Sequence, residues 1–253
     1  MAERFVDVDL SGARFERVDL SGAVLRSVEV DGAEIEAPWL LGGGASLVVN
    51  GVDVAPLVDA ELDARMPGRS LRRASDPEGL RAAWAALEQS WERVLERVAA
   101  MPSGTVDAGV DDEWSFAQTL RHLVMATDTW LGRAVLGLEQ PYHPLGQPHA
   151  EYETDGYDMS VFTTRQPTYE EVLEARAGRQ RMVREHLATL VADDLAQVRA
   201  NPWAPQHAET TLSCLRTILD EEWEHQRYAV RDLDLLQARS ASSDTQPTNM
   251  QKG

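Results

Sequence analysis

Hydrophobic residues recur every three or four positions over four long stretches of the chain, and this spacing predicts four amphipathic helices. The helices are expected at about residues 77–98, 115–137, 168–190 and 211–237. Asp76, followed by a proline, begins the first of them, because Asp is a good helix cap and proline suits the first turn. The pairs Ser115/Gln118 and Thr168/Glu171 match capping boxes at the next two. Four such helices predict a mainly α protein with a four-helix bundle.

A different period governs the first 37 residues, where a large apolar residue stands at every fifth position. These residues are Phe5, Leu10, Phe15, Leu20, Leu25, Val30 and Ile35. Neither a helix nor a flat strand has a period of five, so the pattern suggests a solenoid of stacked turns. The segment resembles pentapeptide repeats, a family that forms a square right-handed β-helix with four repeats per coil. The resemblance implies that the fifth-position residues point inward. Seven repeats make fewer than two coils, so we expect a structural appendage rather than the DNA mimicry of some long members.

The next segment, residues 38–75, predicts a small connector. Asn50-Gly51 lies between two short apolar runs, which is the strongest short signal for a β-hairpin. Pro56 then begins a short helix that is expected to end near Arg65. With the repeat, this hairpin forms the small N-terminal β segment of an otherwise helical chain.

Two further segments lack helical periodicity. Residues 138–167 connect the second and third helices, are rich in Pro, Gly, His and Tyr, and are expected to fold over one end of the bundle. Residues 238–253 are polar and predict a disordered tail. The expected organisation is therefore a repeat segment (1–37), a connector (38–75), a bundle (76–237) and a tail (238–253).

Composition narrows the classes of function. The chain has 42 acidic and 24 basic residues, and its formal net charge of -18 disfavours binding to nucleic acid or to anionic membranes. No apolar run has the length of a membrane span, and the N-terminus lacks the pattern of a signal peptide. A single cysteine, Cys214, excludes an internal disulfide and fits a reducing compartment. We expect a cytoplasmic protein without nucleic-acid or membrane partners. The sequence leaves open whether the protein forms a homodimer.

Three residues on two of the expected helices have the chemistry of metal ligands. Glu221 and His225 are four apart and so lie on one face of the last helix, where a carboxylate and an imidazole can hold one cation. His122 lies outside the apolar stripe of the second helix, beside small residues. Glu222 is an alternative ligand, at a spacing of three from His225. His143 and His149, in the long loop, either line the mouth of such a site or lie in solvent.

At these residues the chain resembles the DinB-like proteins. The resemblance rests on the segment from Trp114 to Val124 and on the segment from Glu221 to His225, and it covers roughly residues 76–236. It implies a four-helix bundle that binds a divalent metal through one His on the second helix and a His-x-x-x-His pair on the last. His122 and His225 match two of these ligands. Glu221 stands where many members have the first His of the pair.

The resemblance also implies a reaction class. The family includes bacillithiol and mycothiol S-transferases, so the expected function is a metal-dependent transfer of a low-molecular-weight thiol, such as mycothiol, to a small electrophile. Two His and one carboxylate suit a catalytic zinc site as well as the facial triad of iron, so zinc is the first choice and nickel, iron or manganese are alternatives. Cys214 is expected in the core rather than as a nucleophile. The competing hypothesis is a non-catalytic ligand-binding or stress-response module with a structural repeat appendage.

Overall fold

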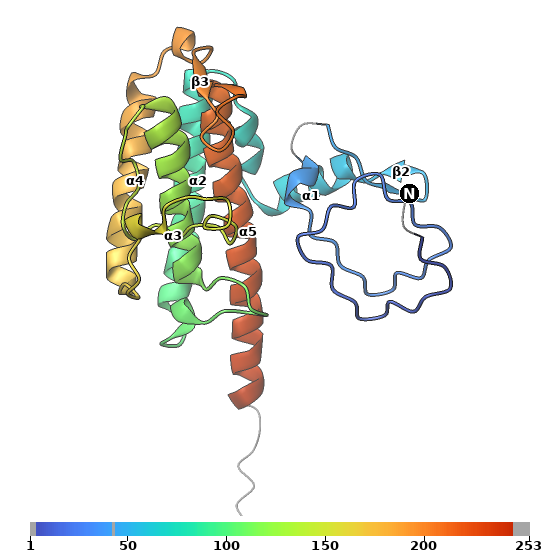
Figure 1. The fold of residues 1–253 in the computed structure, drawn as a ribbon. Coiled ribbons are helices and arrows are strands. Elements are labelled where there is room, and N and C mark those ends of the chain that lie inside the picture. Colours follow the sequence, from blue (N-terminus) through green and yellow to red (C-terminus); the bar gives the residue numbers. More distant parts are fainter. Residues whose placement is uncertain (1–3, 42–43, 245–253) are drawn as a thin grey trace, which may run out of the picture. The chain divides into compact units, whose positions relative to one another are not determined.

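The computed structural model describes residues 4–41 and 44–244, and the chain divides after Ala37 into two compact units. The division coincides with the end of the five-residue pattern. None of the described helices combines the length and the apolar character that a membrane span requires. The chain traces of both units are shown in Figure 1.

The first unit turns once in every repeat. In each of the first six repeats, the residue two positions after the large apolar residue has a positive φ: Asp7, Gly12, Arg17, Gly22, Ser27 and Gly32. Glycine at alternate corners removes the steric cost of this conformation. At each glycine corner a backbone hydrogen bond closes the turn, for example from Ala13 N to Leu10 O at 2.9 Å. The five-residue period of the sequence is therefore a period of backbone turns.

The fifth-position side chains of this unit are exposed rather than enclosed. Phe5 is 67% exposed, Leu10 47% and Ile35 71%, and residues 4–37 contain no assigned strand. Whether these side chains point inward stays a prediction, but the short stack does not bury them. A coil buries its apolar face against the coils above and below it, and fewer than two coils supply too few neighbours.

The connector forms as expected. Strands β1 (Val48–Val49) and β2 (Val52–Asp53) pair antiparallel, and Asn50 and Gly51 between them both have positive φ, as a type I′ turn requires. Helix α1 (Ala55–Arg65) follows, with a proline in its first turn. Short 3-10 turns, η1 (Pro38–Leu41) and η2 (Arg69–Arg73), flank these elements.

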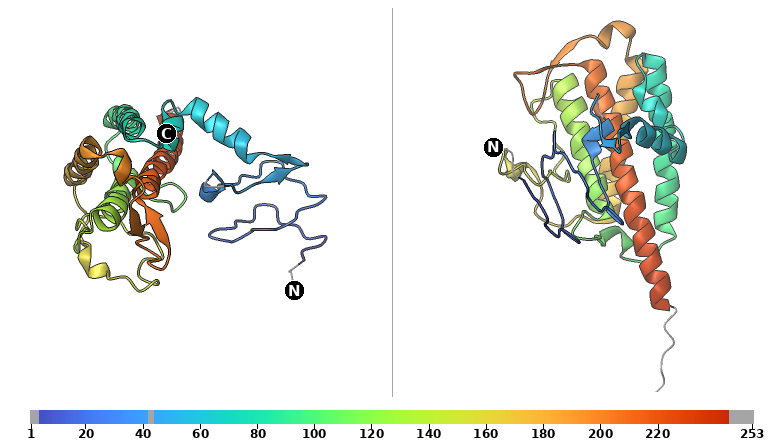
Figure 2. Two further views of the ribbon diagram at one scale, coloured as in Figure 1. Left: turned by 90° about the horizontal axis from the view of Figure 1, so that it is seen from above. Right: turned by 90° about the vertical axis from the view of Figure 1, so that its right-hand side faces the viewer.

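The second unit contains the four-helix bundle that the sequence predicts. Its helices are α2 (Pro77–Ala99), α3 (Phe116–Thr127), α4 (Tyr169–Thr189) and α5 (Thr211–Asp244). Viewed along the bundle (Figure 2, left), α4 and α5 each lie between α2 and α3, so every helix packs against two neighbours. The caps are also confirmed: Asp76 accepts from Gly79 N, and both capping boxes are present.

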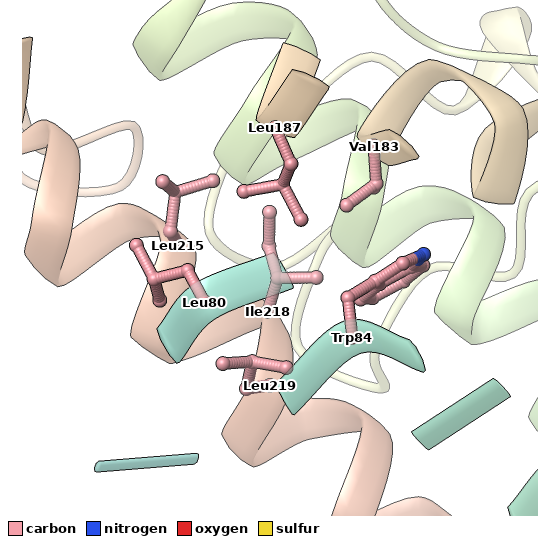
Figure 3. A pocket seen from close by; sticks show the side chains of 7 residues that line it. All are labelled: Leu80, Trp84, Val183, Leu187, Leu215, Ile218 and Leu219. Carbon is pink, nitrogen blue, oxygen red and sulfur yellow. The ribbon is translucent and has the colours of Figure 1, made fainter. Parts of the chain in front are cut away.

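All four helices contribute side chains to the core of the bundle, and at one end those of α2, α4 and α5 meet. Figure 3 shows Leu80 and Trp84 of α2, Val183 and Leu187 of α4, and Leu215, Ile218 and Leu219 of α5. The gap between them has a volume of about 10 Å³, which is the space of a single water at most. The bundle is therefore closely packed at this end and offers no ligand cavity there.

Helix α3 continues as a π-helix, η4 (Asp128–Val135), instead of running as one α-helix to Gly137. The change begins at Asp128, whose buried carboxylate accepts from the Arg179 side chain and from His143 N. Burial raises the pKa of Asp128 to about 6, against the opposing effect of Arg179. The wider turn thus begins where the helix carries a buried polar contact to α4 and to the long loop.

The long loop, residues 138–167, lies along the side of α3 rather than over one end of the bundle (Figure 1). Tyr152 and Phe162 pack on Met125 of α3, and Gln147 N donates to Arg121 O at 3.1 Å. The loop contains one short 3-10 turn, η5 (Met159–Val161). The aromatic side chains of the loop are thus shielded from water by contact with the side of α3.

A hairpin that the sequence did not indicate connects α4 to α5. After the 3-10 turn η6 (Ala192–Asp194), strand β3 (Val198–Ala200) pairs antiparallel with β4 (Ala208–Thr210). Both strands are too short to show an alternating pattern. At the tip of the hairpin, the side-chain oxygen Oδ1 of Asn201 accepts from Trp203 N and Ala204 N.

Helix α5 begins at Thr211 as expected but ends at Asp244, beyond the expected end near Gln237. The expectation of a disordered tail is wrong for residues 238–244, and residues 245–253 lie outside the described part of the chain. Adding residues such as Ala and Arg to the end of an existing helix costs little free energy. Arg239 also forms an ion pair of 3.4 Å with Asp111.

The exposure of the repeat residues predicts that the first unit cannot fold alone. A fragment of residues 1–37 is expected to show no cooperative thermal transition by circular dichroism, because it has no buried core. A fragment of residues 38–253 serves as the control and is expected to unfold cooperatively. A sharp transition in the short fragment would contradict the prediction.

Candidate metal centre

Three side chains from two neighbouring helices converge at one point of the bundle. His122 of α3 and Glu221 and His225 of α5 each offer a ligand atom, and these atoms lie within 4.8 Å of one another. Glu221 Oε2 is 3.3 Å from His225 Nε2 and 3.6 Å from His122 Nε2. The structure thus brings together the three residues that the sequence singled out. Their side chains are only partly buried, with exposed fractions of 13% for His122, 22% for Glu221 and 16% for His225.

The rotation of α5 about its axis separates two adjacent carboxylates. Glu221 faces α3, whereas Glu222 points into the core, where its Oε2 accepts from Trp91 Nε1 at 2.8 Å and forms an ion pair with Arg176. Glu222 is 1% exposed. The alternative in which Glu222 replaces Glu221 as a ligand is therefore wrong, because its carboxylate is engaged with partners on α2 and α4.

The long loop fixes the orientation of His122. Its Nδ1 lies 3.0 Å from the backbone carbonyl of Gln147. A carbonyl only accepts, so Nδ1 carries the proton and donates it to Gln147 O. In the neutral imidazole, Nε2 is then an acceptor, and it faces a carboxylate oxygen of Glu221, which is also an acceptor. Two acceptors in this position require a proton or another cation between them.

Aromatic rings surround the site. Trp114, which precedes the N-cap of α3, has its ring centroid 4.7 Å from that of His122 and 6.0 Å from that of His225. Tyr228, three residues after His225 on α5, lies edge-on to it, with the two ring centroids 5.7 Å apart. These rings restrict the rotamers of both imidazoles and reduce the water around them.

Burial and hydrogen bonding act in opposite directions on the carboxylate. Burial alone would raise the pKa of Glu221, but the two imidazoles, whose protonated forms donate to its carboxylate, outweigh this effect, so the pKa lies well below its usual value. Burial lowers the pKa of His225, against the effect of the Glu221 hydrogen bond. At neutral pH the site therefore presents an ionised carboxylate and a neutral His225, which are the forms that bind a metal ion.

The other candidate residues separate into two groups. His149 of the loop approaches the centre: burial lowers its pKa first, and the charge of nearby His122 lowers it further, against the carboxylate of Glu221 among other acids. Its ring packs against Trp203 at 5.3 Å. His143 instead accepts from Leu145 N and has a structural role. Cys214 is fully buried, and burial raises the pKa of its thiol to about 11, as expected of a core residue.

Sequence reasoning missed two contributors to the centre. Gln147 acts through its backbone carbonyl, which leaves no signal in the side-chain pattern. Trp114 was part of a recognised segment, but its contact with both imidazoles depends on how α3 and α5 pack. Trp203 was not expected near the long loop, because the β3–β4 hairpin was not foreseen.

Two family models match the chain. The model of the DinB superfamily matches residues 86–229, which is more than half of the chain and contains His122, Glu221 and His225. The model described as pentapeptide repeats (8 copies) matches residues 4–36. Comparisons with curated proteins and with solved structures gave no match.

The pKa of His225 predicts an acid-dependent loss of stability in metal-free protein. The ordinary pKa of this residue in the unfolded chain is about 6.5. Below that pH the unfolded chain binds more protons at His225 than the folded chain does, so the free energy of unfolding decreases as the pH is lowered. The contribution of Glu221 does not change in this range, because it is lost only below its unfolded pKa of about 4.3. With EDTA present, His225→Gln is expected to reduce the drop in melting temperature between about pH 7 and about pH 5.

The exposed His207 supplies the matched control for this measurement. His207→Gln is expected to keep the wild-type drop in melting temperature, since its imidazole lies in solvent. Equal drops in the two variants would contradict the assigned direction of the His225 shift.

Proposed function

Because the chain belongs to the DinB superfamily, whose members generally bind metal, we propose that His122, Glu221 and His225 bind one divalent metal ion. The observation that carries the proposal is the pair of facing acceptors, His122 Nε2 and Glu221 Oε2, at 3.6 Å. A cation between them turns an unfavourable contact into two favourable ones. The backbone carbonyl of Gln147 supports His122 from behind, as outer-shell groups do for metal-bound imidazoles.

The distances fit a metal ion of ordinary size. Ligand atoms at 2.0–2.2 Å from a tetrahedral ion are about 3.4 Å from one another. The two measured contacts of Glu221, at 3.3 and 3.6 Å, match that separation. Three protein ligands leave a fourth position free, which is the arrangement of catalytic rather than structural zinc sites.

Two imidazoles and one carboxylate favour zinc. Iron, nickel and manganese remain the alternatives, since imidazole and carboxylate also suit these ions. Glu221 stands where many members of the family have the first histidine of the pair, so it adds a negative charge that a site of three histidines lacks.

We infer further that the site serves the transfer of a low-molecular-weight thiol, such as mycothiol, to a small electrophile. A bound divalent ion supplies Lewis acidity, which lowers the pKa of a thiol in its open position. In the transfer, the S–H proton passes to solvent, a carbon–sulfur bond forms at the electrophile, and the leaving group departs with the electron pair of the bond that breaks.

The chain's own residues supply position and surroundings for this transfer. Trp114 and Tyr228 limit the water at the centre, and the ring of His149 on the long loop packs against Tyr152 and Trp203. Cys214 is buried with a raised thiol pKa, so the reacting thiol comes from solution.

The alternative function is a non-catalytic ligand-binding module. It is favoured by one observation: with His225 or His122 protonated, the three side chains satisfy one another without a metal ion. In that case the centre would be a buried hydrogen-bonded cluster that stabilises the packing of α3 on α5.

Metal content separates these two functions. Freshly purified wild-type protein is expected to contain about one divalent ion per chain by elemental analysis. His225→Ala removes a ligand, and because changes to outer-shell groups alone cost roughly 10- to 100-fold in affinity, the variant is expected to lose its metal. His207→Ala, an exposed histidine, is the control and is expected to retain it. Wild-type protein without metal would contradict the proposal.

The source of the thiol is tested separately. Conjugation of a small electrophile to mycothiol, followed by mass spectrometry of the product, is expected to require metal and to be lost in His225→Ala. Cys214→Ala is expected to keep most of the activity, since the thiol is buried in the core. Loss of activity in a folded Cys214→Ala protein would place the nucleophile in the chain itself.

A further inference from the structure

A hollow lies on the bundle surface beside the candidate metal centre. It is an open hollow of about 440 Å³, bordered by the first turns of α3, by Gln147 and by residues 163–167 of the loop before α4. None of His122, Glu221 and His225 lines it. Nine of its eleven lining residues are polar, and the volume falls within the range of small-molecule sites.

Two charged residues of this hollow, Arg121 and Asp107, have no ion-pair partner among the described residues. Asp107 accepts from Gln166 Nε2 at 3.1 Å, and Arg121 is the unpaired cation. Its Nε donates to Leu145 O at 2.9 Å, which holds the guanidinium in place, and its two terminal nitrogens have no partner among the described residues. Arg165, the other arginine of the hollow, is by contrast fully occupied by a bidentate ion pair with Glu171 at 2.6 and 2.7 Å.

An unpaired arginine is unexpected in this protein. The chain has 18 more acidic than basic residues, so carboxylates are abundant, yet none of the described ones reaches Arg121. The side chain is half-buried, and burial lowers its pKa without any compensating carboxylate. A guanidinium stays charged in proteins, and partial burial of a charge without a counter-ion costs free energy. A bound anion would offset that cost.

The neighbouring groups also offer donors. The hydroxyl oxygens of Ser115 and Thr163 each accept a backbone N–H, from Gln118 and Arg165 respectively, and neither hydroxyl donates to a described residue. Each therefore keeps one O–H for a ligand. The hollow thus combines a planar cationic fork with hydroxyl and amide groups, which suits a carboxylate on a molecule that carries its own hydroxyls.

We propose that this hollow binds a small hydroxylated carboxylate, with the carboxylate on the terminal nitrogens of Arg121 and the hydroxyls on Ser115 and Thr163. The site is separate from the metal centre but adjoins it through one residue. Gln147 lines the hollow, donates its backbone N–H to Arg121 O, and accepts from His122 at its backbone carbonyl.

The test uses gluconate and gluconamide, two polyhydroxylated probes that differ in the carboxylate. Each is titrated into the full chain by isothermal titration calorimetry in EDTA, at an ionic strength kept constant with chloride. Gluconate is expected to bind saturably and gluconamide not to bind. Arg121→Gln, which removes the charge, is expected to weaken gluconate binding by about tenfold or more.

Two variants act as controls. Arg165→Gln changes the paired arginine of the same hollow and is expected to leave gluconate binding unchanged, whereas Arg121→Lys keeps the charge but loses the fork and is expected to weaken it. Circular dichroism checks that each variant is folded. If Arg121→Gln does not fold, the comparison of the two probes on the wild type and the Arg121→Lys variant decides the question.

Four results would overturn the proposal: no saturable gluconate binding to the wild type, equal binding of gluconamide, unchanged binding in folded Arg121→Gln, or tighter binding of inorganic phosphate at the same residue. Metal-free His225→Ala is expected to bind gluconate as the wild type does. Failure of the proposed metal chemistry would therefore be seen in a different variant and with a different measurement.

Discussion

The buried ion pair between Glu222 and Arg176 is the constraint on which the metal centre depends. Adjacent residues on a helix point about 100° apart, so fixing Glu222 in the core fixes where Glu221 points. Trp91 on α2 and Arg176 on α4 both contact the Glu222 carboxylate, and removing one partner of such a pair typically costs about 3–5 kcal/mol. This contact holds α5 in the rotation that directs Glu221 and His225 toward α3.

The connector also fixes the position of α5, through an ion pair. Arg72 of η2 forms an ion pair of 2.5 Å with Asp220, and Arg69 is buried between Asp59 and Asp63 of α1. Asp220 directly precedes Glu221. The residues on either side of Glu221 are thus tied to different parts of the second unit, one to the connector and one to the core.

The long loop gives the centre its chemistry. Without the Gln147 carbonyl, either nitrogen of the His122 imidazole could carry the proton. With it, the proton is on Nδ1, and the lone pair of Nε2 faces Glu221. The same residue borders the hollow in which Arg121 lies. Because the loop packs along the side of α3 rather than over its end, Gln147 contacts His122 of the candidate centre and also borders the hollow.

The sequence determined the elements and the identity of the candidate ligands. Helix caps, the Asn50-Gly51 turn and the five-residue period act through neighbours along the chain, so local chemistry suffices to predict them. The i, i+4 spacing likewise placed Glu221 and His225 on one face before any packing was known. The short β3–β4 hairpin and the last turns of α5 had no such local signal.

Only the tertiary structure decided which of two adjacent carboxylates enters the centre, which nitrogen of His122 is free, and which arginine lacks a partner. Each of these depends on groups far away in the chain: Glu222 on Arg176, His122 on a backbone carbonyl of the loop, and Arg121 on the absence of a described acid near it. The same holds for the repeat segment. Its period fixed the turns, but whether its apolar residues are buried depends on how many coils stack, and this chain has too few to cover them.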